Sequence, residues 1–140
     1  MTDYVVDASV AVKWFLPEVH TDVALRIRAP SYRLHIPSFF ILEFSNILCK
    51  KIRNDEITRD QGDFALQELR NIPFSRHADE SLLPQAFALA NDTRRSLYDS
   101  LYVALAIAID GKVVTADRKL VLALQNSPYA AHLCWIEDLA

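Results

Sequence analysis

The chain has 140 residues, of which 51% are hydrophobic, and it carries a formal net charge of −3. This length suits one domain spanning residues 1–140, and the hydrophobic content excludes an intrinsically disordered chain. The longest strongly apolar stretch, residues 101–109, is well short of the roughly 20 residues that cross a bilayer, and no basic-then-apolar leader opens the sequence, so we expect a cytoplasmic protein.

Hydrophobic periodicity and breaker residues predict alternating strands and helices. We expect four strands, over residues 4–6, 33–36, 112–115 and 132–136. Between them we expect helices over 9–15, 20–28, 39–53, from Thr58 to before Pro73, and over 79–91, 96–109 and 117–125. Short apolar strands separated by helices indicate an α/β fold whose parallel sheet is covered on both faces.

Local capping signals support several of these boundaries. Ser38 is expected to cap the helix over 39–53, since a serine side chain can accept a hydrogen bond from a free backbone N–H there. Thr58 and Gln61 have the spacing of a capping box. Cys49 and Cys134 lie among apolar neighbours and form no C-x-x-C pair, which predicts buried free thiols.

Four acidic residues stand out by their position. Asp7 and Asp117 each follow an apolar strand and precede a helix, and Asp99 lies three residues after Ser96, so each could be no more than a helix cap. Glu43 is different, because the stretch around it is apolar almost all round and indicates a buried helix. An ionised carboxylate in such a place needs a partner, and no basic residue lies within one turn on the same helical face.

In parallel α/β sheets, reactive groups collect at the carboxyl ends of the strands, so we expect the four acids to meet there. Helix N-termini favour the ionised forms of Asp7, Asp99 and Asp117, and like charges about 4 Å apart repel by roughly 1 to 4 kcal/mol per pair. Such a cluster requires a cation. Oxygen ligands without His or Cys select Mg²⁺, with Mn²⁺ as a substitute.

Mg²⁺ held by carboxylates and water suits phosphodiester hydrolysis, which favours a nuclease. With only two glycines, Gly62 and Gly111, the chain can hold neither a phosphate-binding P-loop nor a dinucleotide-binding fingerprint. The net charge is acidic, but local basic clusters that could line an RNA groove occur at 50–53, 94–95 and 118–119.

Around these acids the sequence resembles the PIN-domain nucleases, especially the VapC-type toxins of toxin–antitoxin pairs. The four motifs follow the family's order across nearly the whole chain: Val5-Val6-Asp7-Ala8-Ser9-Val10, Ile41-Leu42-Glu43-Phe44-Ser45-Asn46-Ile47-Leu48, Leu97-Tyr98-Asp99-Ser100-Leu101-Tyr102-Val103-Ala104-Leu105-Ala106 and Val114-Thr115-Ala116-Asp117. The resemblance implies a three-layer α/β/α PIN-like domain with a parallel sheet of about five strands. It also implies Mg²⁺-dependent endonucleolytic cleavage of RNA, a homodimer and inhibition by a small cognate antitoxin.

The resemblance further implies a role for each site residue. Asp7 and Asp99 would be the principal metal ligands, Asp117 would bind metal directly or through water, and Glu43 would position or deprotonate the attacking water. Hydrogen-bonding groups behind them would be Ser9, Asn46 and Thr115. Some family members carry a further acid after the fourth motif, where this chain has Leu120, Val121 and Leu122, so a second metal ion stays open.

Other functions remain to be separated from a nuclease. A phosphoacceptor receiver domain also combines an acidic Mg²⁺ pocket with a threonine and a lysine, here Thr115 and Lys119, although Glu43 lies in a helix and is the wrong residue type for its acceptor. A non-catalytic PIN-like interaction module is another alternative. A D-x-D phosphatase is disfavoured because Ala8 and Ser9 follow Asp7. Trp14 and Phe15, beside Pro17, are predicted to be exposed and available to a dimer interface.

Overall fold

A computed structural model describes residues 1–139 and contains one sheet of five parallel strands in the order β3-β2-β1-β4-β5. The strands are β1 (Thr2–Val6), β2 (Tyr32–Pro37), β3 (Ser75–His77), β4 (Lys112–Thr115) and β5 (Leu133–Trp135). The helices are α1 (Ala8–Phe15), α2 (Thr21–Arg26), α3 (Phe40–Arg53), α4 (Arg59–Leu69), α5 (Asp79–Thr93), α6 (Leu97–Ala108) and α7 (Arg118–Leu124), and short 3₁₀ helices follow at Pro128–His132 and Ile136–Asp138. The predicted parallel α/β fold is therefore confirmed.

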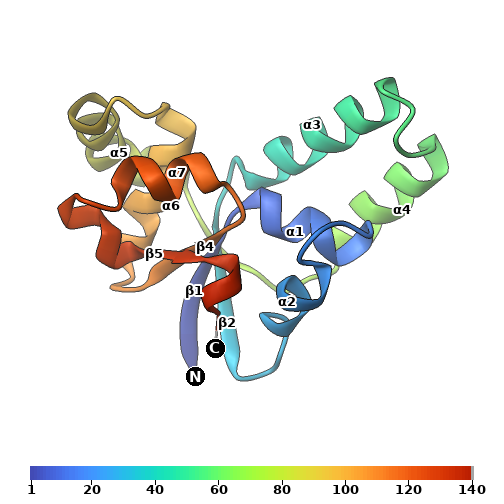
Figure 1. The fold of residues 1–140 in the computed structure, drawn as a ribbon, viewed down its shortest axis with the longest axis horizontal. Coiled ribbons are helices and arrows are strands. Elements are labelled where there is room, and N and C mark those ends of the chain that lie inside the picture. The colour runs from blue at the N-terminus through green and yellow to red at the C-terminus, as the bar shows by residue number, and fades with distance from the viewer. Residues whose placement is uncertain (140) are drawn as a thin grey trace.

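Helices cover both faces of the sheet. Helix α6 packs on β1, β2 and β4, with α5 against its outer side, while α1 packs against β4 and contacts α2 and α3. Figure 1 shows α3 and α4 extending away from the sheet on the side opposite to α5 and α6. The result is a three-layer arrangement in which the carboxyl ends of the central strands lead into the first turns of α1 and α7.

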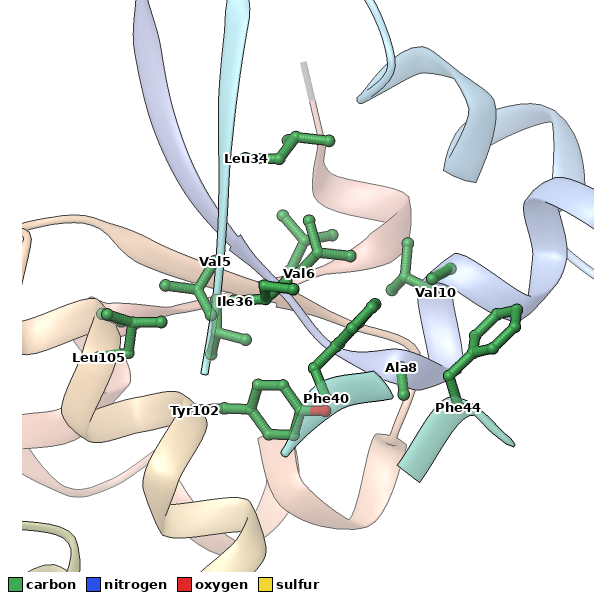
Figure 2. Packing of buried hydrophobic residues seen from close by; sticks show 14 of the residues in the cluster. Val5, Val6, Ala8, Val10, Leu34, Ile36, Phe40, Phe44, Tyr102 and Leu105 are labelled. Carbon is green, nitrogen blue, oxygen red and sulfur yellow. The ribbon is translucent and has the colours of Figure 1, made fainter. Parts of the chain in front are cut away.

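The core lies on both sides of β1, where Val5 and Val6 point to opposite faces and are both fully buried. This double burial explains why the central strands are continuously apolar instead of alternating. Figure 2 shows the Tyr102 ring extending from α6 toward Ala8 and Phe40, at the point where the core meets the ends of the strands. A polar hydroxyl is thus carried to the edge of an otherwise apolar cluster.

Some predicted helix caps are confirmed and one is wrong. Thr58 and Gln61 form the capping box of α4, and the Ser96 side chain accepts from the Asp99 N–H. Ser38 does not cap α3: its hydroxyl accepts from the Asp79 N–H, at the start of α5. The Asp79 carboxylate in turn accepts from the Phe39 N–H, so this pair of bonds ties the beginnings of α3 and α5 together.

One strand was missed by the sequence pattern, and two further sequence predictions are wrong. Strand β3 was not predicted, because its three residues have no apolar pattern and it exists through pairing with β2. Trp14 is buried and donates to the Ala24 carbonyl, so it belongs to the core instead of a free surface. Cys49 is an exposed free thiol and Cys134 is only partly buried. Within residues 1–139, no helix has the length and apolar character needed to cross a bilayer.

Candidate active site

The four predicted acids come together at the carboxyl end of the sheet. Asp7 directly follows β1, and Asp117 lies two residues beyond the neighbouring strand β4. Asp99 and Glu43 are in the first turns of α6 and α3, respectively. Glu43 experiences the negative charge of all three aspartates, and Asp7 that of Asp99, so the cluster is electrostatically coupled.

Asp7 is the buried centre of this cluster, with 7% of its surface exposed. Its Oδ1 accepts from the Ser9 N–H at 2.9 Å, as an N-cap of α1, and its Oδ2 accepts from the Thr115 hydroxyl at 2.8 Å. Burial raises the pKa of Asp7 to about 6, despite these bonds, which act in the opposite direction. The helix N-terminus therefore does not keep this carboxyl at its ordinary acidity, contrary to what its position alone suggests.

Glu43 is half-buried, and its Oε1 accepts from the Tyr102 hydroxyl at 2.7 Å. Burial and then the charge of Asp7 raise the pKa of Glu43 to about 7, while the Tyr102 bond opposes this rise. Tyr102 was not singled out from the sequence. The available signal was a tyrosine within a strongly apolar helix, because a buried hydroxyl needs a hydrogen-bonding partner.

Two of the three predicted supporting residues hold the ends of β1 and β4 together. The Thr115 hydroxyl donates to Asp7 and accepts from the Asp117 N–H at 2.9 Å, while the Ser9 hydroxyl accepts from the Ala116 N–H at 3.3 Å. Asp117 caps α7 through the N–H groups of Lys119 and Leu120. The third, Asn46, is exposed one turn after Glu43 and lines a groove beside it.

Arg95 forms an ion pair with the cluster. Its Nη2 lies 3.0 Å from Asp99 Oδ2. Among residues 1–139, no other basic side chain forms an ion pair with any of the four acids. Its Nε is buried and has no hydrogen-bond partner within the described chain. From the predicted basic clusters, Lys51 instead pairs with Glu18, and Arg118 lies over the Trp135 ring, so neither is directed at the acids.

The donor set fits a hard divalent cation bound in an open manner. In the described part of the chain, no group of three or more His, Cys, Asp or Glu side chains is arranged so that it could hold a metal ion as it stands. Mg²⁺ commonly uses one or two protein carboxylates and completes its octahedron with water, so a closed cage is not required. Asp7 and Asp99 would offer carboxylate oxygens for direct contact, and Asp117 accepts its capping hydrogen bonds through Oδ1.

Comparisons with known proteins give a family match for this chain. A family model described as PIN domain matches residues 4–123. The chain is 35% identical over 118 residues to "Ribonuclease VapC3" of Pyrobaculum aerophilum, covering 83% of this chain and 90% of the relative. It is 36% identical over 119 residues to "Ribonuclease VapC3" of Mycobacterium tuberculosis, covering 85% of each.

Solved structures share the fold. The crystal structure of PAE2754 from Pyrobaculum aerophilum superposes with a TM-score of 0.68 at 24% identity, covering 90% of this chain and 82% of that one. A toxin–antitoxin complex from Klebsiella pneumoniae gives a TM-score of 0.61 at 13% identity, covering 95% of this chain and 97% of that one. At these identities the structural likeness extends to the fold.

Proposed function

We propose, from the premise that this chain belongs to the PIN-domain family, that it is a divalent-metal-dependent endoribonuclease and the toxin of a toxin–antitoxin pair. The observation that carries the proposal is the coupled carboxylate cluster, in which a buried Asp7 and three further acids share one edge of the sheet. Relatives named as ribonucleases that cover most of the chain support the choice of RNA as substrate.

The residues divide into two roles. Asp7 and Asp99 would hold Mg²⁺, or Mn²⁺ in its place, and Asp117 would contribute directly or through water. The ion would supply charge neutralisation at the phosphate and lower the pKa of a bound water. Glu43 would act as general base, since a pKa of about 7 lets it accept a proton near neutral pH. As the water oxygen bonds to phosphorus and a P–O ester bond breaks, the water proton would pass to the Glu43 carboxylate and the leaving ribose oxygen would take a proton from solvent.

Arg95 supplies positive charge where a phosphate would have to approach four acids. It neutralises Asp99 in the metal-free protein through Nη2, while its Nε is buried and out of reach of a substrate. Guanidinium groups suit this task because their fork of N–H donors matches the geometry of phosphate. A cation at this position reduces the local negative charge that an approaching phosphate meets.

The remaining partners follow from the family. We propose that a small antitoxin binds and inhibits this chain in the cytoplasm, in line with the structural neighbour whose title describes a toxin–antitoxin complex. We also propose a homodimer, although Trp14 cannot take part in it because it lies in the core.

The decisive experiment incubates purified protein with total cellular RNA and maps the new ends. We expect cleavage with Mg²⁺ or Mn²⁺, none in EDTA, and recovery when excess Mg²⁺ is added back. Cleavage that continues unchanged in EDTA would show that the activity does not depend on a metal ion. The absence of cleavage under all of these conditions would show that the protein is not a ribonuclease.

Removing the Tyr102 hydroxyl should shift the pH dependence of cleavage. In Tyr102→Phe the ring still fills the core, but Glu43 loses a bond that opposes the rise of its pKa. The acidic limb of the kcat profile should therefore move to higher pH, with a loss of about 10-fold near neutral pH. A pH–rate series on both proteins measures this, and an unshifted limb would mean that Glu43 is not the titrating base.

The phosphoacceptor alternative has a weaker basis in the geometry. Asp7 does follow the central strand, but it is buried and both its oxygens already accept hydrogen bonds, which leaves little room for phosphorylation. Incubation with acetyl phosphate and Mg²⁺ tests it by intact mass. A stable mass gain of one phosphoryl group, lost in Asp7→Asn, would favour the receiver function.

A further inference from the structure

The groove beside Glu43 has the chemistry of a site for a flat, uncharged ring. Its volume is about 370 Å³, and it is lined by Phe39, Leu42, Glu43, Asn46 and Tyr98. Its lining comes from Phe39 and the first two turns of α3 and from the first turn of α6. Volumes of this order are typical of small-molecule sites with apolar walls and a few polar groups.

Its walls are large apolar side chains that the protein leaves in solvent. Leu42 is 73% exposed and Tyr98 is 61% exposed. Helix α3 was predicted to be buried, but its buried residues are Phe40, Phe44 and Leu48, on one face. The Phe39 and Tyr98 rings are 5.6 Å apart between centroids, and Phe39 also lies 5.2 Å from the Tyr102 ring. A continuous aromatic row therefore runs from the surface to the tyrosine that binds Glu43.

We propose that this groove receives an unpaired nucleobase of the RNA, adjacent to the phosphodiester that is cleaved, with Tyr98 and Phe39 as the stacking surface. This inference rests on the proposed ribonuclease function and adds to it a base-binding subsite with named residues. The groove and the carboxylate cluster share Glu43, so a nucleotide whose phosphate reaches the cluster has its neighbouring base within the groove.

Charge selects the base over the other parts of RNA. The lining contains one carboxyl and no basic residue, so it disfavours a phosphate, whereas the face of a base is uncharged and stacks on aromatic rings. Asn46 adds an amide with both donor and acceptor capacity for the edge of a base. A base-paired duplex cannot insert a base here without unstacking it, so structured RNA should be a poorer substrate.

The test measures single-turnover cleavage and binding of a single-stranded oligoribonucleotide that carries 2-aminopurine, in Mg²⁺ buffer. Tyr98→Ala should weaken binding by about 5- to 150-fold, the range that corresponds to loss of one stacked base, with a smaller effect on the cleavage rate at saturation. Tyr98→Phe keeps the ring and should remain within about twofold of wild type. The matched control is Phe64→Ala, which removes a comparably exposed ring from α4, away from the groove, and should change nothing.

The outcomes separate this inference from the proposed function. If the wild type cleaves RNA and Tyr98→Ala binds the oligonucleotide as tightly as wild type, the nuclease stands and the base site is overturned. If no RNA is cleaved but 2-aminopurine fluorescence is quenched in a Tyr98-dependent way, the site stands without the nuclease. Loss of self-association in Tyr98→Ala, measured by light scattering, with unchanged RNA binding would show that a second copy covers the groove and would also overturn the inference.

Discussion

Replacing Asp7 with Asn should lower the rate of RNA cleavage by more than about 100-fold, the upper end of losses seen when residues that only support metal ligands are changed. Asp7 sits at the buried centre of the cluster, where an amide keeps the shape of the side chain but removes the charge that attracts a divalent cation. The amide oxygen can still accept from the Ser9 N–H, and its NH₂ can donate to the Thr115 hydroxyl, so the cap of α1 survives.

The control for this prediction is Asp63→Asn, the same chemical change on the exposed face of α4, where Asp63 pairs only with Arg59. It should cleave RNA like the wild type. Thermal unfolding and circular dichroism of both variants check that the fold is kept. Substantial cleavage by a folded Asp7→Asn protein at saturating Mg²⁺ would mean that Asp7 does not hold the ion.

In the absence of metal, the stability of the protein should fall as pH rises from about 4 to about 8. The folded-state pKa of Asp7 is raised from 3.8 to about 6, so its contribution is present below the unfolded pKa and is lost as pH rises through the folded one. The loss assigned to Asp7 is about 2 kcal/mol over this interval. Glu43 acts in the same direction up to about pH 7.

Urea unfolding in EDTA at a series of pH values measures this effect. The difference in unfolding free energy between wild type and Asp7→Asn gives the contribution of Asp7 together with its coupling to Glu43. His77 changes stability in the opposite direction, because burial lowers its pKa, but it is present in both proteins and cancels in the difference. Mg²⁺ at 100 times the wild-type Kd should stabilise the wild type by about 2.7 kcal/mol, and should stabilise Asp7→Asn by no more than about 1.4 kcal/mol if its Kd is at least 10-fold higher. If the difference in unfolding free energy between the two proteins does not change with pH, folding does not raise the pKa of Asp7.

Features set by neighbouring residues could be predicted from the sequence. The capping box of Thr58 and Gln61 and the Ser96 cap of α6 depend on residues three positions apart, and both are present. The parallel sheet followed from short apolar strands separated by helices. The position of Asp7 and Asp117 after strands placed them at the same edge, because parallel strands end on one side.

Features that depend on contacts between distant parts of the chain could not be predicted from the sequence. Ser38 has the local pattern of a cap for α3, yet its hydroxyl is used by Asp79, 41 residues away. Strand β3 has no pattern of its own and is defined by β2. The pKa values of Asp7 and Glu43 depend on burial by elements from the whole chain, so position at a helix N-terminus suggested ordinary acidity for a carboxyl that the fold makes less acidic.

The most direct test of the account is Mn²⁺ binding, followed by the electron paramagnetic resonance signal of the free ion, with Mg²⁺ as competitor. Wild type and Asp63→Asn should take up Mn²⁺ and release it to Mg²⁺, while Asp7→Asn and Asp99→Asn should bind it at least about 10-fold more weakly. Equal uptake by all four proteins, or none by the wild type at millimolar metal, would show that these carboxylates do not share a cation.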